Sequence, residues 1–317
     1  ITERNLMGNG QFLRLKLGGS ADRLQVDLSF TEPRFLDKNI AAGFDVFHKE
    51  LDLTCSSSYK TRRTGFVPRI GFPLSEDLWM SVNYTISRDE IYDVLPGASL
   101  AVQNAVGTAL TSSVGLGLRY DTRNHPRNPN KGIYLSADAD FAGLGGDVQY
   151  VRVQGEGRAY YPIFEKVTLV GRVVAGHIEG WGGEDVRLLD VFYRGGETVR
   201  GFDKAGFGPR DLGTGDALGG KSYWAANAEV RFPLPFLSES LGMNGAVFAD
   251  AGSLFNAAEG ANVVANLADD SAVRASVGAS IIWDSPLGPL RFDYAFPLAK
   301  QDYDEIQEFR FGASTRF

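Results

Sequence analysis

The sequence predicts an all-β protein, specifically an antiparallel β-barrel that spans a membrane. Three observations predict this class. Long segments alternate apolar and polar residues with a period of two. No run of about 18 apolar residues is present to form a membrane helix. Tight turns alternate with long connections along the chain, as they do in outer-membrane barrels.

The period-two alternation defines the strands. Residues 24–30 place Leu24, Val26 and Leu28 on one face, with polar residues on the other. The same pattern predicts about fourteen strands, near residues 11–19, 24–33, 40–50, 61–73, 77–92, 112–122, 131–143, 148–161, 166–179, 222–234, 243–252, 272–284, 288–298 and 308–317. The stretch "ITERN" at the start reads as the tail of another strand, and no convincing amphipathic helix lies between the strands.

The polar face of the strands separates a membrane barrel from a soluble β-sandwich. Many long strands with short links favour a closed barrel, whose lumen accepts charged side chains. The charges on this face are Arg14, Lys16, Asp27, Arg119, Asp138, Asp140, Arg152, Glu156, Arg158, Glu229, Arg231, Arg274, Arg291 and Asp293. The outer face is then an apolar band edged by aromatic residues such as Trp79, Tyr120, Tyr161, Trp224, Trp283 and Phe317.

Composition and one motif bear on nucleic acid and nucleotides. A net charge of -7 without a basic stripe argues against nucleic acid as a partner. The stretch "GDALGGKS", residues 215–222, fits the phosphate-binding pattern G-x-x-x-x-G-K-[ST]. However, a glycine-rich loop precedes it and a period-two strand follows, so no helix N-terminus would face a phosphate. We therefore predict no nucleotide binding.

Catalytic and metal sites find little support in the sequence. The three histidines, His48, His125 and His177, are far apart, and neither G-x-S-x-G nor H-E-x-x-H occurs. Asp138 and Asp140, or the acidic run at 301–305, could attract divalent ions, but lumen lining and a solvated loop explain them better. We predict no enzyme activity, no metal and no cofactor. Cys55 is the single cysteine, cannot form an internal disulfide and has no predicted role.

Several phrases carry a family resemblance: "RNLMGNGQ", "SFTEPRFLDKNIAAGFDVF", "RYDTRNHPRNPNKG", "YRGGETVRGF", "VFADAGSLF", "SPLGPLRFDYAFPL" and "FRFGASTRF". In this order they resemble the barrel domain of the BamA family of outer-membrane protein assembly factors. The resemblance implies a barrel of about sixteen strands, of which residues 1–317 lack the first strand or two and the preceding POTRA domains. It also implies that residues 180–221 form a long extracellular loop folded into the lumen.

The resemblance further implies a site in that loop. Val199, Arg200, Gly201 and Phe202 would form the loop anchor, with Arg200 held by acidic residues of the lumen wall. The matching acids are Glu229 and Asp250. Alternation independently places Glu229 inward, whereas Asp250 is less clear because the aromatic Phe248 shares its parity. Gly195, Gly196 and Gly201 would permit tight turns around the arginine.

The last strand carries a second implied site. Phe309, Phe311 and Phe317 face one way, and this strand would meet the first strand at a weak lateral seam where client strands pair by β-augmentation. The family often has a glycine kink late in this strand. Aligned on the terminal aromatic residue, Ser314 stands there, while the nearest glycine is Gly312.

The implied function is insertion of β-barrel proteins into the bacterial outer membrane. The implied partners are outer-membrane lipoproteins of the assembly complex, unfolded β-barrel clients, periplasmic chaperones and membrane lipid. A TamA-like or two-partner secretion transporter of the same superfamily is the main alternative. A general diffusion porin and a barrel hydrolase are further ones.

Overall fold

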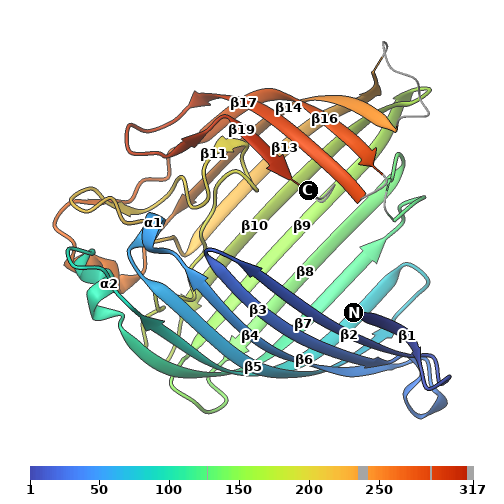
Figure 1. Ribbon diagram of the computed structural model, residues 1–317, viewed down its shortest axis with the longest axis horizontal. Coiled ribbons are helices and arrows are strands. Elements are labelled where there is room, and N and C mark those ends of the chain that lie inside the picture. Colours follow the sequence, from blue (N-terminus) through green and yellow to red (C-terminus); the bar gives the residue numbers. More distant parts are fainter. Residues whose placement is uncertain (127, 235–241, 286–287, 313–317) are drawn as a thin grey trace.

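The computed structural model describes residues 1–126, 128–234, 242–285 and 288–312. Fifteen strands form one antiparallel sheet that curls into a barrel wall (Figure 1). The strands are β1 (Thr2–Leu6), β2 (Gln11–Ser20), β3 (Arg23–Glu32), β4 (Ala41–Asp52), β5 (Lys60–Pro73), β6 (Leu78–Tyr92), β7 (Gly107–Asp121), β8 (Gly132–Ala142), β9 (Tyr150–Phe164), β10 (Val167–Gly180), β13 (Ser222–Pro233), β14 (Met243–Phe255), β16 (Arg274–Ser285), β17 (Gly288–Ala299) and β19 (Phe309–Gly312).

Each strand pairs with the next wall strand along the chain, so the order is that of an up-and-down barrel. The all-β prediction is confirmed, and a strand lies at every predicted position, including β1 at "ITERN". Within the described residues, β1 and β19 are the two edges of the sheet. The predicted strand 308–317 is described as far as Gly312, and Ser314 and Phe317 lie outside the described residues.

Four single-turn helices lie in the described parts of the connections, where the alternation predicts none. They are η1 (Phe35–Asp37), α1 (Thr54–Ser57), α2 (Leu100–Asn104) and η3 (Glu259–Val263). Three to five residues are too few to show a helical period, so sequence periodicity could not reveal them. In the described part of the chain, no helix has the length and apolar character needed to cross a membrane.

The wall separates an apolar outer face from a charged inner face. Paired positions such as Leu28 and Val46 lie on the outside, and Arg69 and Asp45 form an ion pair on the inside. One aromatic prediction is wrong. Trp79 pairs with Arg119 and packs against Gly71, so it lies on the inner face, as the strand parity of β6 requires.

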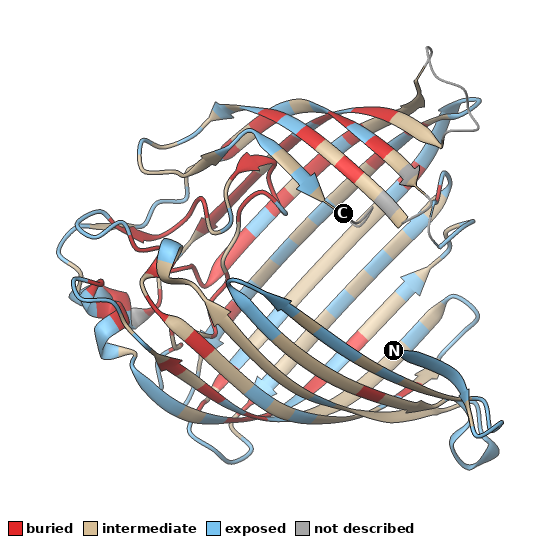
Figure 2. Ribbon diagram, viewed as in Figure 1, coloured by how far each residue is buried: buried red, intermediate tan, exposed pale blue. Residues whose placement is uncertain are grey.

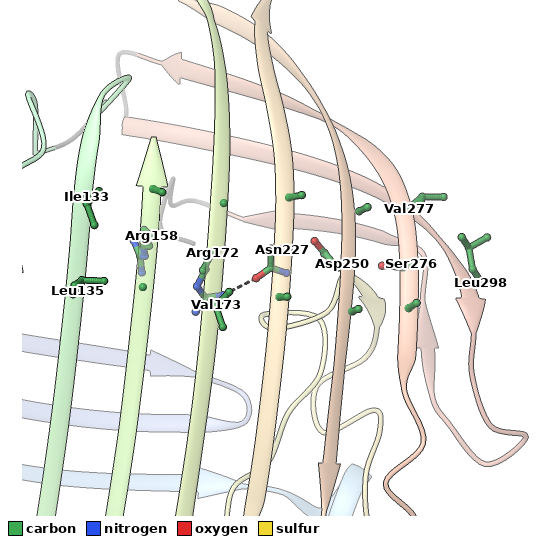
Figure 3. A pocket seen from close by; sticks show the side chains of 18 residues that line it. Ile133, Leu135, Arg158, Arg172, Val173, Asn227, Asp250, Ser276, Val277 and Leu298 are labelled. Atoms are coloured by element: carbon green, nitrogen blue, oxygen red, sulfur yellow. Dashed lines mark hydrogen bonds between the residues drawn. The ribbon is translucent and has the colours of Figure 1, made fainter. Parts of the chain in front are cut away.

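A broad apolar depression lies on the outer face, and Figure 3 shows the residues that line it. It measures about 710 Å³ and crosses β8 to β17. Small residues of the middle strands line it, among them Gly157, Ala159, Gly171, Ala226, Ala228, Ala249 and Ala251. The side chains of Arg172 and Asn227 lie on the inner face of the same strands, joined by a hydrogen bond. Small outward side chains therefore thin the outer surface over strands whose inward side chains include Arg172 and Asn227.

The connections at one end of the barrel fold together into a compact cap. The longest, residues 181–221, contains β11 (Gly201–Phe202) and β12 (Arg210–Asp211), and it extends within the curve of the sheet (Figure 1). β11 pairs with β18 (Ile306–Gln307) and β12 with β15 (Leu267–Ala268). Buried residues gather where this segment meets the wall (Figure 2). Its core includes Val199, Phe202 and Leu218.

Candidate functional site

A tight turn in segment 181–221 presents Arg200 to the wall. The backbone N–H groups of Thr198 and Val199 both donate to the carbonyl oxygen of Gly195, at 2.8 and 2.9 Å. Gly195 must be glycine here, because a Cβ would lie 1.8 Å from the carbonyl oxygen of Asp203. The side chain of Asn227 on β13 donates to the carbonyl of Thr198 at 2.9 Å. The turn is thus fixed by its own backbone and by the wall.

Arg200 contacts both acidic residues that the sequence singled out. Its Nε and Nη2 donate to the two carboxylate oxygens of Asp250, each at 2.7 Å, and its backbone N–H donates to the same carboxylate at 3.0 Å. Its Nη1 donates to Glu229 at 2.7 Å. The guanidinium fork therefore bridges β13 and β14, which a single ammonium could not do with the same geometry.

The inward orientation of Phe248, on the same strand face as Asp250, has a structural reason. Phe248 lies on the inner face with Asp250, and the Arg200 guanidinium stacks on its ring at 3.4 Å from the centroid. An aromatic ring facing the lumen supplies a cation–π contact to a buried cation. The apolar residue that made Asp250 unclear in the sequence is thus part of the arginine site.

Further charges complete a balanced cluster around Glu229. Arg291 on β17 donates to Glu229 at 2.7 Å and to Asp293 at 2.7 Å. Arg231 donates to the other oxygen of Glu229 at 2.7 Å. With Arg200 and Asp250, the cluster holds three arginines and three carboxylates, and its formal charge is zero. All six side chains are at most 17 % exposed, so each charge depends on its partners for solvation.

The residues next to Arg200 tie the same turn to the start of the last strand. Gly201 has φ +94°, a region that favours glycine, and pairs with Gln307. Phe202 is fully buried, pairs with Ile306 and packs edge-on against Phe207 at 5.4 Å. Val199 is also fully buried. Residues 199–202 are therefore bound to residues 306–307 as well as to the barrel wall.

The described part of the last strand, β19, lies at an edge of the sheet. Phe309 and Phe311 are more than half exposed on the outer face and pair with Tyr294 and Phe292 of β17. The N–H of Ala295 donates to the carbonyl of Glu308 at 2.8 Å. Because antiparallel hydrogen-bonded pairs alternate, the backbone groups of Phe309 and Phe311 then point to the open edge. Phe317 lies outside the described residues.

A second arginine of the segment, Arg187, was not identified from the sequence. Its Nη2 lies 3.3 Å from Asp89 on β6 and donates to Thr111 on β7 at 3.0 Å. Its Nε donates to Asp190 in the same segment at 2.7 Å. Segment 181–221 is consequently fastened to two separate parts of the wall. The inward parity of Asp89 was the available signal, but nothing local in the sequence linked it to Arg187.

The stretch "GDALGGKS" lies in the cap. Asp216 accepts hydrogen bonds from the Ser58 hydroxyl at 2.5 Å and the backbone N–H of Ser99 at 2.6 Å. Lys221 lies 3.2 Å from Glu179. Ser222 begins strand β13, not a helix. These residues thus join three connections of the cap, in a setting unlike that of a phosphate-binding loop.

The structure brings together a serine and a histidine that are distant in the sequence. The antiparallel register of β10 and β13 brings His177 Nδ1 to 2.8 Å from the Ser222 hydroxyl. His177 Nε2 is 3.7 Å from Glu179, which is longer than a hydrogen bond. Both the histidine and the glutamate side chains are about half exposed on the outer face. The arrangement lacks the oriented base that a nucleophilic serine requires.

Two of the acidic residues considered for divalent ions, Asp138 and Asp304, form ion pairs with arginines. Asp138 pairs with Arg119 at 2.8 Å, and Asp304 of the run 301–305 pairs with Arg274 at 3.0 Å. Among the described residues no group of three or more potential ligands could hold a metal ion. Cys55 is exposed in α1.

The sheet forms a curved antiparallel wall that is apolar outside and charged inside, and a loop of the same chain is bound to its inner face. These features define a membrane β-barrel whose lumen is plugged by a loop. Comparison with known proteins identifies the family. The Omp85 superfamily domain matches residues 5–317, and the chain belongs to this superfamily.

Curated relatives named as assembly factors match nearly the whole chain. The outer membrane protein assembly factor BamA of Neorickettsia risticii is 32% identical over 98% of this chain, and that of Neisseria meningitidis is 27% identical over 100%. The chain covers 43% and 44% of these two relatives, less than half of each. The crystal structure of BamA from Haemophilus ducreyi lacking POTRA domains 1–3 matches with a TM-score of 0.87 and 26% identity, over 98% of this chain and 65% of that one. CdiB from Acinetobacter baumannii shares the fold at 13% identity and a TM-score of 0.60, over 97% of this chain and 54% of that one.

Proposed function

We propose that this chain is the membrane-spanning part of an outer-membrane protein assembly factor. It would reside as an integral protein of the bacterial outer membrane and insert β-barrel clients there. The observation that carries the proposal is the combination of a whole-chain match to BamA relatives with an Arg200 anchor that reaches from the lumen wall to the root of an edge strand.

The edge strand supplies the proposed chemistry of insertion. Backbone N–H and C=O groups at an open edge can pair with another strand, which makes an edge a template for β-augmentation. Within the described residues, β19 pairs with β17 through four residue pairs and has no partner strand on its other side. Segment 181–221 fixes the root of this strand, because Asp203 and Gly206 exchange backbone hydrogen bonds with Glu305 at 2.9 and 2.8 Å.

Segment 181–221 itself is proposed to be an extracellular loop folded into the lumen. Two arginine anchors and a buried core hold it in place, which suits a plug better than a mobile gate. The proposed partners are lipoproteins of the assembly complex, unfolded clients, periplasmic chaperones and membrane lipid. Assembly of this kind requires no nucleotide, metal or cofactor, since folding of the client supplies the free energy, and we propose no enzyme activity.

A TamA-like or two-partner secretion transporter remains the alternative, because the wall and loop architecture suits both. A transporter would move an unfolded chain through the lumen, whereas an assembly factor would fold a barrel client into the bilayer. A porin would instead give a steady large conductance, and a hydrolase would lose its activity on replacing one serine or histidine, such as Ser222 or His177.

The test uses the full-length protein in lipid vesicles with a urea-unfolded outer-membrane barrel as client. We expect heat-resistant folded client to accumulate faster than in empty vesicles. Phe311→Pro removes one N–H from the open edge and should slow assembly, whereas the matched control Phe311→Leu keeps the N–H and should not. Wild-type protein that gives no acceleration would refute the function. Equal rates for both variants would refute the role of the β19 edge.

A further inference from the structure

The connection between β3 and β4, residues 33–40, exposes two large apolar side chains. Phe35 is 44% and Leu36 is 73% exposed. Leu36 has φ 56° and ψ 38°, the left-handed conformation that glycine adopts readily and that a side chain disfavours. The chain therefore holds a leucine in a strained conformation and directs it away from the protein interior.

The exposed residues are rigidly held. The N–H of Phe35 donates to the carbonyl of Ile40 at 2.8 Å, closing the connection. The N–H groups of Asp37 and Lys38 donate to the carbonyls of Arg34 and Phe35, at 3.1 and 3.2 Å. Exposure of Phe35 and Leu36 is thus a defined feature of the fold, because the backbone around them is hydrogen-bonded in one conformation.

The two side chains extend the lipid-facing surface of the barrel. Phe35 and Leu36 line a shallow groove of about 740 Å³ together with Phe30 and Phe44, whose rings are 5.6 Å apart on the outer face of β3 and β4. An apolar surface that continues from the outer wall to the tip of a connection fits the boundary between acyl chains and head groups.

The charges around this groove come in both signs. The side chains of Arg34 and Lys38 form no ion pair within the described residues. Glu32 accepts hydrogen bonds from the Gln11 amide at 2.8 Å and the backbone N–H of Arg34 at 3.0 Å, and Asp37 lies between the two cations in the sequence. The two cations and two anions give a net charge of zero. Such a pair of charge types complements a zwitterionic head group, in which a phosphate is joined to an ammonium group.

We propose that residues 33–40 form a membrane-interface anchor that seats a zwitterionic phospholipid. Phe35 and Leu36 enter the acyl region, Arg34 and Lys38 contact the lipid phosphate, and the neighbouring carboxylates face its ammonium group. The proposal rests on membrane insertion of the barrel and is independent of client assembly, so a chain that failed to assemble clients could still show it.

Site-directed spin labelling of the full-length protein in phosphatidylethanolamine–phosphatidylcholine vesicles tests the position of the anchor. Cys55→Ser removes the single cysteine of residues 1–317, and Leu36→Cys then carries the nitroxide. We expect collision rates with oxygen to exceed those with a water-soluble nickel reagent, as for a control label at the outward-facing Val46. A label at Glu76, in another connection at the same end, should show the opposite. A water-like label at 36 would overturn the proposal, and so would a label shielded from both reagents, which would indicate protein cover.

A second measurement tests the head-group contacts. Arg34→Gln together with Lys38→Gln should move the label at 36 toward water, and at least halve the ratio of oxygen to nickel collision rates. Lys131→Gln, which neutralises an exposed lysine in another connection of that end, should leave the ratio unchanged. Retained heat-resistant migration on gels confirms that each variant is folded. An unchanged ratio in the double variant would overturn the phosphate contact, and a response only in vesicles of anionic lipid would overturn the zwitterionic assignment.

Discussion

Replacement of Arg200 by alanine is the most informative single change in the lumen. The substitution removes two side-chain hydrogen bonds to Asp250 and one to Glu229, together with the stacking contact on Phe248. The backbone N–H of residue 200 remains, so Asp250 keeps one of its three donors. Glu229 keeps Arg291 and Arg231. The stranded group is therefore the carboxylate of Asp250.

The expected loss of stability follows from the uncompensated charge of Asp250. Removing one partner from a buried ion pair costs about 3–5 kcal/mol, because the remaining charge is uncompensated. Both side chains are almost fully buried, so no discount for solvent applies. At about 2 °C per kcal/mol for a large domain, Arg200→Ala should lower the midpoint of thermal unfolding by roughly 6–10 °C.

The assay is the temperature at which the purified barrel loses its folded, fast-migrating band on gels. Arg194→Ala is the matched control. Arg194 belongs to the same segment and stacks on Tyr223 at 3.7 Å, but it forms no ion pair within the described residues. We expect a small shift for this control. Arg200→Ala combined with Asp250→Ala should recover part of the loss, since it removes the stranded carboxylate.

Two results would refute this reasoning. The first is an unchanged midpoint and normal client assembly in Arg200→Ala. The second is a double variant less stable than expected from adding the two single changes, because the energy would then not come from the pair.

Three further predictions concern the cap and the turn. Arg187→Ala leaves the Asp89 carboxylate on β6 with other donors, so the free energy of unfolding should fall by only about 1–3 kcal/mol. Proteolysis of segment 181–221 should become faster, and unchanged proteolysis would contradict the second anchor. Gly195→Ala places a Cβ 1.8 Å from the carbonyl oxygen of Asp203 and should loosen the same segment, whereas Gly260→Ala, which meets no atom within 4 Å, should not; equal proteolysis of these two variants would contradict the tight turn. Burial raises the pKa of the Tyr59 phenol to about 12, whereas the phenol pKa in the unfolded chain is near 10. The unfolded chain therefore loses this proton first, and the stability of the fold decreases as the pH rises from about 10 to 12. Melting curves at increasing pH should show a smaller decrease in Tyr59→Phe, and an equal decrease in both proteins would contradict this origin.

Local pattern predicted the strands and the inward face of Glu229 because both are short-range properties. Alternate side chains of a strand point to opposite faces, so a period of two reports which residues a wall turns inward. The same rule, applied consistently, would also have placed Trp79 inside. An aromatic residue at a strand end can lie on either face, and residue type by itself misled the assignment.

The sequence by itself determined an all-β barrel, the position of its wall strands and the long segment that carries Arg200. Only the tertiary structure decided that Phe248 supports Arg200, that Arg187 forms a second anchor, and that Gly201 and Phe202 pair with residues 306–307. These contacts join residues about 50 to 100 positions apart. No local period encodes such pairs, because the curvature of the whole sheet brings them together.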